Sequence, residues 1–372
     1  MRTSAVAAIV FANVKDDLLR KLTTKRSMAS VPFGSRYRMI DFTLSNLVNA
    51  GIDNVGIITK ENYRSLMDHV GSGIYWDLDR KNGGLYLLPP YSTSGARRYN
   101  GTVDALNGAH DFIKRCKSEY IVLCDADLLA NVDIASALKS HVETKADVTV
   151  IYHNGDVPRN TGETMILKLD AENRVTEIDF NEEGGFDADF GLGITIISRE
   201  LLDSLVSEAI RNDLLSFNED VLAKKLKQLR IYGYEHSEYA AVMCGTKTYY
   251  SSSMDLLNRE VRSQLFNKER PIYTKDRDDM PTRYGTKSVV NNSLIADGCV
   301  IDGTVKNSIL FRGVKVEKGA VVENSILMQE TVVKADAQID NVVSDKNGVI
   351  GEKMVLKGTD KKHFFVKKNE IV

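Results

Sequence analysis

The 372-residue sequence has few cysteines, little net charge and no long hydrophobic run, and each of these absences excludes a class of protein. Its four cysteines show no C-x-x-C or Cys/His spacing, which argues against a structural zinc site and against a disulfide framework. A formal net charge of −2 provides no global basic field for nucleic acid or an anionic membrane. No stretch reaches the roughly 18 apolar residues of a membrane helix. We therefore expect a reduced, cytoplasmic protein that binds neither nucleic acid nor membrane.

The N-terminal part alternates between strand-like and helix-like segments. Apolar runs predict strands at 4–12, 55–59, 120–125 and 147–153, and helical periodicity predicts helices at 40–51, 61–70, 101–115 and 134–143. This alternation is typical of an α/β domain with a mostly parallel sheet and helices on both faces. The pattern ends at a charged, proline-bearing segment, which we predict to be a linker. The predicted division is an α/β domain at 1–266, the linker at 267–285 and a second domain at 286–372.

The C-terminal part contains an internal repeat. Similar tetrapeptides begin at Asn292, Asn307, Asn324 and Asn341, at intervals of 15, 17 and 17 residues. About 17 residues fit one coil of three hexapeptide sides, each pointing an aliphatic side chain inward, so the repeat predicts a left-handed parallel β-helix. An ordinary meander of short strands is the alternative.

Several motifs resemble ADP-glucose pyrophosphorylases, which are glucose-1-phosphate adenylyltransferases that supply ADP-glucose for glycogen and starch. They are VPFGSRYRMIDFTLSNLVNAGI (31–52), YNGTVDA (99–105), EYIVLCDAD (119–127), FNED (217–220) and RPIYT (270–274). With the hexapeptide repeats they cover nearly the whole chain. The resemblance implies a Rossmann-like nucleotidyltransferase domain, a homo- or heterotetramer, Mg²⁺, ATP and glucose 1-phosphate.

The sequence departs from this family in the loop that wraps the triphosphate. Active members carry G-G-x-G-T-R-L directly after the first strand, since a close backbone approach to phosphate favours residues without Cβ. Here the segment from Phe11 to Arg20 contains no glycine, and we expect Asp16 and Asp17 to face a triphosphate. Like charges about 4 Å apart cost on the order of 4 kcal/mol at an effective dielectric near 20. The loop is therefore predicted not to hold ATP.

Other family positions have also lost their polar groups. The resemblance places a phosphate-binding lysine at Met28, the sugar-phosphate lysine at Asn181 and a metal-binding aspartate at Met243. Removing a single preorganised electrostatic contact typically costs about 10² to 10³ in rate. No catalytic residue is therefore expected to be functional, and no cofactor is assigned, although the family uses Mg²⁺.

Three features could be remnants of a site. Asp127 matches the first metal-binding aspartate, with a helix N-cap as the alternative. Gly101 and Thr102 match the nucleotide pocket. Lys25 and Arg26 fall where the family binds phosphorylated effectors between subunits, with a solvated basic turn as the alternative.

These observations predict a regulatory, catalytically degraded subunit that modulates a catalytic paralogue in a heterotetramer, with a phosphorylated sugar or nucleotide as effector. One alternative is a divergent, weakly active sugar-1-phosphate nucleotidyltransferase. Another is a free-standing sugar-phosphate sensor that needs no partner subunit.

Overall fold

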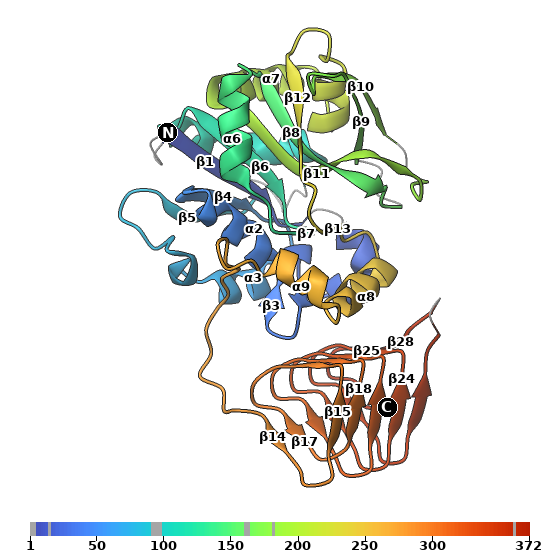
Figure 1. Ribbon diagram of the computed structural model, residues 1–372. Helices are drawn as coiled ribbons and strands as arrows, with labels where there is room; N and C mark the ends of the chain where they lie inside the picture. The colour runs from blue at the N-terminus through green and yellow to red at the C-terminus, as the bar shows by residue number, and fades with distance from the viewer. Residues whose placement is uncertain (1–4, 14–15, 91–98, 160–163, 181–182, 360–361) are drawn as a thin grey trace.

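The protein has an α/β part and a β-helical part, joined by an extended segment (Figure 1). The computed structural model describes residues 5–13, 16–90, 99–159, 164–180, 183–359 and 362–372. Helices cover both faces of the α/β sheet, and a layer of helices separates that sheet from the β-helix (Figure 1). Asn181 lies outside the described residues.

One half of the sheet is parallel, as the sequence predicts. Its strands lie in the order β6 (Tyr120–Asp125), β1 (Val6–Phe11), β4 (Asn54–Ile58) and β5 (Gly84–Leu88). All six residues of β1 are buried, as expected of a parallel strand covered on both faces. The helices of this half are α2 (Met39–Asn49), α3 (Arg64–Val70), α4 (Thr102–Gly108), α5 (His110–Arg115) and α6 (Ile134–Glu143). The helix predicted at 101–115 is thus two helices, which separate after Gly108, a poor helix former.

The other half of the sheet is mixed. It contains β8 (Val148–Asp156), β9 (Met165–Leu169), β10 (Val175–Phe180), β11 (Asp187–Ser198) and β12 (Ile231–Glu235). The long strand β11 runs antiparallel to β6, β8 and β9, whereas β12 is parallel to β8. In this half the sequence predicted β8, at 147–153, but none of the strands that follow it, because antiparallel hairpins after β8 need no intervening helix.

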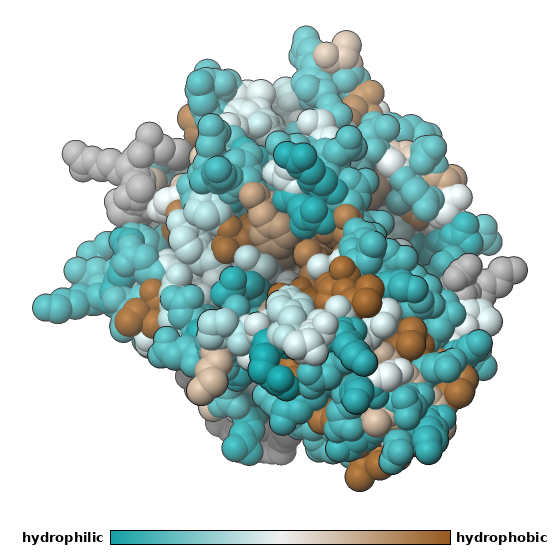
Figure 2. Space-filling model, turned by 60° about the horizontal axis from the view of Figure 1, so that its bottom comes forward, coloured by the Kyte–Doolittle hydropathy of each residue, from teal (hydrophilic) through white to brown (hydrophobic). Residues whose placement is uncertain are grey.

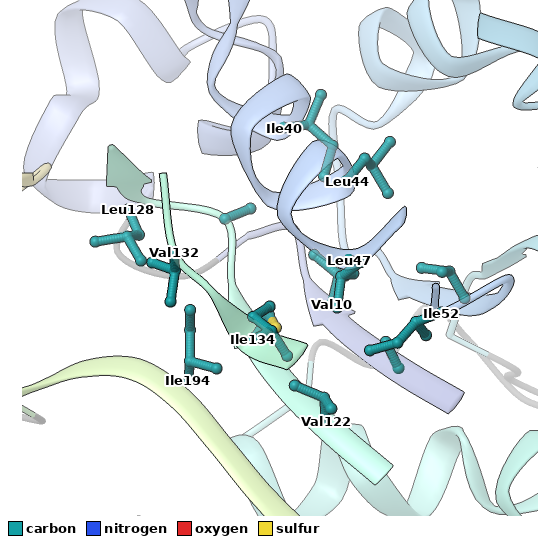
Figure 3. Packing of buried hydrophobic residues seen from close by; sticks show 14 of the residues in the cluster. Val10, Ile40, Leu44, Leu47, Ile52, Val122, Leu128, Val132, Ile134 and Ile194 are labelled. Carbon is teal, nitrogen blue, oxygen red and sulfur yellow. The ribbon is translucent and has the colours of Figure 1, made fainter. Parts of the chain in front are cut away.

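Helix α2 holds the core of the parallel half together. Ile40, Leu44 and Leu47 recur at helical spacing along it and are fully buried. All three belong to the buried cluster that contains Val10 of β1 and Val122 of β6, and Leu47 lies beside Val10 (Figure 3). The sequence therefore places one apolar face of α2 on the sheet.

The remaining short elements form the layer that faces the β-helix. They are η2 (Asp16–Leu19), α1 (Arg20–Thr23), η3 (Met28–Ser30), β2 (Pro32–Phe33), β3 (Tyr37–Arg38), α8 (Thr246–Asp255) and α9 (Arg259–Leu265). Elsewhere in the α/β part lie η4 (Ile74–Trp76), β7 (Leu128–Ala130), α7 (Arg199–Arg211), a π-helical segment η5 (Phe217–Ala223) and β13 (Ala240–Val242).

The predicted β-helix is confirmed. Its described strands stack in three parallel five-stranded sheets. The first sheet contains β14 (Arg283–Tyr284), β17 (Val300–Ile301), β20 (Lys315–Val316), β23 (Val332–Val333) and β26 (Val349–Ile350). The second contains β15 (Val289–Asn291), β18 (Thr304–Lys306), β21 (Val321–Glu323), β24 (Gln338–Asp340) and β27 (Val355–Lys357). The third contains β16 (Leu294–Ile295), β19 (Ile309–Leu310), β22 (Ile326–Leu327), β25 (Val342–Ser344) and β28 (Phe364–Val366). β14 begins inside the segment predicted to be the linker.

The repeated asparagines form one corner of the coil. Asn292, Asn307, Asn324 and Asn341 all have positive φ, between 41° and 55°. Asparagine tolerates this left-handed conformation better than most residues, which explains its recurrence.

The third sheet of the β-helix faces the α/β part through an apolar interface, here called the interdomain core. Ile309 and Ile326 belong to this core together with Leu22 and Phe33. The residues that follow them, Leu310 and Leu327, belong to the core inside the β-helix. The extended segment is tied to α2, since Thr274 Oγ1 donates to Asp41 at 2.6 Å and Asn49 donates to the Pro271 carbonyl at 3.0 Å. The two parts therefore form one packed body.

The face seen in Figure 2 is largely hydrophilic, with hydrophobic residues gathered near its middle. In the described residues, no helix is both long enough and apolar enough to cross a membrane.

Candidate functional site

The segment after β1 is held by a network of its own side chains. The Asp16 carboxylate accepts hydrogen bonds from the Met28 backbone N–H at 2.7 Å and from Asn13 Nδ2 at 2.6 Å. Asn13 Oδ1 accepts from the Lys60 N–H at 2.7 Å, and Thr23 Oγ1 donates to the Asp16 carbonyl at 2.6 Å. The Asp16 carboxyl group therefore accepts the backbone N–H of Met28, the position at which the resemblance places the family's phosphate-binding lysine.

Asp16 and Asp17 have different surroundings. Burial raises the pKa of the Asp16 carboxyl above its usual value, although the hydrogen bonds from Asn13 and Met28 oppose the shift. Asp17 has a side chain 90% exposed and lies 3.6 Å from Arg20. Asp17 therefore points into solvent, whereas Asp16 is part of the folded segment, and the expectation that both face a triphosphate stays a prediction.

Met28 and Met243 are both fully buried in the interdomain core. They come from distant parts of the chain, η3 and the segment after β13, and both pack in this cluster with Leu129 and Tyr249. A lysine or aspartate at either position would be buried among apolar groups. Both methionine side chains are therefore part of the hydrophobic core.

The C-terminal end of β6 carries two carboxylates beside a very small cavity. Asp125 and Asp127 line a space of about 20 Å³ together with Met165 and Asn218. This volume has room for about one water molecule. Gly193, with a φ of 69°, lies so close that a Cβ there would be 2.5 Å from Asp125. Among the described residues, little space is therefore left beside Asp125 and Asp127.

The residues at this strand end do not fit Mg²⁺. The ion needs near-octahedral oxygen coordination and keeps several of its waters, which the cavity cannot hold. Among the described residues, no group of three or more His, Cys, Asp or Glu side chains is placed to hold a metal. Asp127 is 1% exposed, and its carbonyl accepts from the Met243 N–H at 2.9 Å. The alternative of a helix N-cap is wrong, because Asp133 caps α6, whereas the role of Asp127 as a residual metal ligand stays a prediction.

Gly101 and Thr102 join α4 to the segment before η5. Thr102 Oγ1 accepts from the Phe217 N–H at 2.8 Å, and a Cβ on Gly101 would lie 2.3 Å from the Leu215 carbonyl oxygen. Neither is among the described residues that line the cavity beside Asp127. Close packing of α4 accounts for both, and their role as remnants of a nucleotide pocket stays a prediction.

Lys25 and Arg26 do not form the solvated basic turn considered from the sequence. Lys25 is exposed, but Arg26 is 3% exposed and its Nη2 donates to both oxygens of Asp345 in the β-helix, at 2.8 and 3.0 Å. The Nη1 atom of Arg26 is buried and has no hydrogen-bond partner among the described residues. An effector role for the pair stays a prediction, and Arg26 already has one anionic partner.

Further cations surround this ion pair. Burial lowers the pKa of Lys346 to about 7, with the charges of Arg38 and Arg26 acting in the same direction. Burial likewise lowers the pKa of Arg38 to about 10. We call Arg26, Arg38 and Lys346 the interdomain cation cluster. Sequence reasoning missed Arg38 and Lys346, because Lys346 lies 320 residues from Arg26 and only the docking of the β-helix brings them together.

Comparison with known proteins agrees with this architecture. Residues 8–243 match the nucleotidyl transferase family model, and residues 280–372 match the GlmU-like C-terminal hexapeptide model. The chain therefore belongs to the nucleotidyl transferase family.

Its relatives place it more narrowly, among the ADP-glucose pyrophosphorylases. It is 36% identical over 350 residues to the glycogen biosynthesis protein GlgD of Bacillus subtilis, covering 94% of this chain and 92% of the relative. It is 38% identical over 316 residues to GlgD of Geobacillus stearothermophilus, covering 84% and 82%. It is also 33% identical over 356 residues to a glucose-1-phosphate adenylyltransferase of Bacillus mycoides, covering 94% and 92%.

Proposed function

We propose that this chain is a catalytically inactive, regulatory subunit that modulates a catalytic glucose-1-phosphate adenylyltransferase in glycogen synthesis. The observation that carries the proposal is the hydrogen bond from the Met28 N–H to the Asp16 carboxylate. It places a carboxyl group, held by hydrogen bonds from Met28 and Asn13, in the segment that corresponds to the family's triphosphate loop. Since anions repel, an ATP phosphate would have to displace this carboxylate.

Two further observations support the loss of activity. Met28 and Met243, where the resemblance places a phosphate-binding lysine and a metal-binding aspartate, are buried thioethers in the interdomain core. The cavity beside Asp127 is too small for a nucleotide or a sugar phosphate. Adenylyl transfer depends on metal ions and cations that neutralise the developing charge.

The preserved scaffold supports a role in assembly. The interdomain core and the β-helix are intact, and the β-helix exposes large apolar side chains such as Tyr284, Val289 and Val355. Exposed apolar groups of this kind suit contact with another subunit. We propose a hetero-oligomer, most simply a heterotetramer, located in the cytoplasm.

The interdomain cation cluster supports regulation by a phosphorylated sugar or nucleotide. Arg26 has an unused buried nitrogen, and Lys346 would regain its full charge beside an added anion. Because the cluster joins both parts of the chain, an effector bound there would act on their relative packing.

The proposal is tested with Mg²⁺, ATP and glucose 1-phosphate by measuring pyrophosphate release. The chain alone should give no turnover above background. When it is mixed with its catalytic paralogue, the two should elute together on gel filtration, and the kinetics should differ from those of the paralogue alone. Co-elution without any change in kinetics, or no co-elution, would contradict regulation. Lys346→Met should weaken the effector response of the mixture, whereas the exposed control Lys318→Met should not.

The alternative, a divergent and weakly active nucleotidyltransferase, is favoured by the two carboxylates Asp125 and Asp127 at the end of β6. Turnover by the chain alone that is lost in Asp127→Asn would establish it.

A further inference from the structure

An aromatic pocket lies at the end of the sheet opposite the candidate functional site. It has a volume of about 360 Å³ and is formed by the C-terminal end of α2, the loop around η4 and the extended segment. Asp53 lines it just before β4 begins, whereas Asp125 of the candidate site ends β6. Since β4 and β6 both run parallel to β1, the two places lie at opposite ends of these strands.

Aromatic and aliphatic side chains form much of the pocket. They are Val48, Ile52, Ile74, Tyr75, Trp76 and Tyr273. Ile74 is 63% exposed and Tyr273 is 39% exposed, so apolar surface at the pocket is left in contact with water. A ligand with an apolar face would cover this surface, which is favourable.

The rings of the pocket do not form a parallel-sided slot. The planes of Tyr75 and Trp76 meet at 90°, with 6.3 Å between the ring centres. A nucleobase is typically held by stacking between flat side chains on both of its faces, which two perpendicular rings cannot provide. A puckered ring with C–H groups on its face needs only one aromatic surface, so the arrangement favours a sugar over a base.

The charged residues of the pocket form one fixed group. Arg80 Nη1 donates to the Asp53 carboxylate at 2.8 Å, and Arg80 Nε donates to the Asp77 carbonyl at 2.7 Å. Arg80 Nη2 also donates to the Asp77 carboxylate. Among the described residues that line the pocket, two carboxylates thus stand against one guanidinium. An anionic ligand would be repelled by these carboxylates, whereas hydroxyl groups, which both donate and accept, suit them.

The walls of the pocket are held by backbone hydrogen bonds. The N–H groups of Trp76 and Leu78 both donate to the Gly73 carbonyl, at 3.0 and 3.1 Å. On the other side, the Tyr273 N–H donates to Ser45 Oγ of α2 at 2.8 Å. A ligand would therefore meet a largely preformed site, at a lower cost in ordering.

These features suit an uncharged ligand with an apolar face and many hydroxyl groups, which is the chemistry of a saccharide. We propose that the pocket binds one or two glucose units of an α-glucan chain. Its volume of about 360 Å³ lies at the lower end of the roughly 300–1,000 Å³ of small-molecule pockets. The choice of an α-glucan rests on the proposed function in glycogen synthesis, whereas saccharide binding rests on the pocket alone. Such binding would hold the chain on the polymer whose synthesis it serves.

Isothermal titration of the full chain alone with maltotriose, cellotriose and adenosine tests the proposal, together with native gel electrophoresis through glycogen. We expect maltotriose to bind with a Kd of about 1 mM and glycogen to retard the chain. Tyr75→Ala and Tyr273→Ala should each weaken maltotriose binding about tenfold, because each removes an aromatic contact surface. Arg80→Met should weaken it by a similar factor.

The matched controls are Tyr63→Ala and Arg115→Met. Both replace exposed residues that do not line the pocket, and both should bind maltotriose like the wild type. Unchanged melting curves would show that each variant remains folded.

No maltotriose binding below about 10 mM, with unchanged migration in glycogen, would overturn the proposal. Equal affinities of pocket variants and controls would do the same, as would tighter binding of adenosine than of maltotriose. Cellotriose that binds as tightly as maltotriose would refute the assignment to an α-glucan. Because these measurements need no paralogue, a chain that modulates its paralogue but binds no saccharide would refute this inference alone and leave the proposed function standing.

Discussion

Arg26 and Asp345 form a buried ion pair between the α/β part and the β-helix, in which Nη2 of Arg26 lies 2.8 and 3.0 Å from the two carboxylate oxygens. The two residues are 319 positions apart in the sequence. Their side chains are 3% and 5% exposed, so neither charge can be solvated if the other is removed. The pair therefore makes the docking of the two parts depend on a specific match of charges.

We expect Asp345→Ala to lower the free energy of unfolding by about 3–5 kcal/mol, because it leaves the Arg26 guanidinium buried and unpaired. Arg26→Met with Asp345→Leu should cost much less than the sum of the single changes. Denaturant unfolding measures both. The control is Asp17→Ala, which breaks an exposed pair and should cost under about 1 kcal/mol. Equal effects of Asp345→Ala and Asp17→Ala would contradict the role assigned to the buried pair.

The pKa of Lys346 predicts a pH dependence of stability. The folded state lowers this pKa to about 7, mainly through burial, so the unfolded chain binds the extra proton between pH 7 and about 10.5. The free energy of unfolding should therefore rise with pH above 7, and Lys346 contributes up to about 1.4 kcal/mol per pH unit to this rise. Below pH 7 Lys346 is protonated in both states and destabilises the folded state by its full amount. Other groups titrate in the same range, so the test is the difference between wild type and Lys346→Met.

Lys346→Met should remove this rise and stabilise the protein near neutral pH. Denaturant unfolding at pH 6, 7, 8 and 9 measures the difference for both chains. Parallel curves for wild type and variant would show that Lys346 does not titrate in this window.

Restoring the family's charged residues should not restore activity. Met28 and Met243 are fully buried in the interdomain core, so Met28→Lys or Met243→Asp places a charge among apolar groups. We expect each to lower the free energy of unfolding by more than about 3 kcal/mol, with no pyrophosphate release. Met28→Leu and Met243→Leu keep the volume and should cost under about 1.5 kcal/mol. A stable, active Met28→Lys/Met243→Asp variant would refute this account of the site.

The network around Asp16 predicts that removing its carboxyl group lowers stability without restoring ATP binding. Asp16→Ala removes the acceptor of the Met28 N–H and of Asn13, which should cost about 1–3 kcal/mol. Replacing residues 12–19 with G-G-x-G-T-R-L removes Asp16 and supplies glycine backbone, and only this graft should give measurable ATP binding. Filter binding of labelled ATP to both variants provides the measurement. ATP binding by Asp16→Ala alone would show that the Asp16 carboxylate, and not the lack of glycine in the loop, prevents ATP binding.

The sequence by itself determined the two parts of the fold and the absence of glycine from the segment after β1. Alternating apolar segments predicted the parallel strands β1, β4 and β6, because buried parallel strands need continuous hydrophobic residues, but they missed β5. The registered asparagines predicted the coil, since few other residues tolerate its corner conformation. The lack of glycine at 11–20 is visible in the sequence alone. Whether a loop can approach a phosphate closely depends on the conformations open to its own residues, and these follow from residue type.

Only the tertiary structure decided where the charges and the apolar faces lie. The repeat predicted inward-pointing aliphatic residues, yet Ile309 and Ile326 face outward to the α/β part while Leu310 and Leu327 point inward. Arg26 read as half of a basic turn until Asp345 was placed against it. Local patterns fix which conformation a segment favours. Which side chains are buried together depends on contacts between residues hundreds of positions apart, and burial is what sets the pKa of Lys346 and the cost of a charge at Met28.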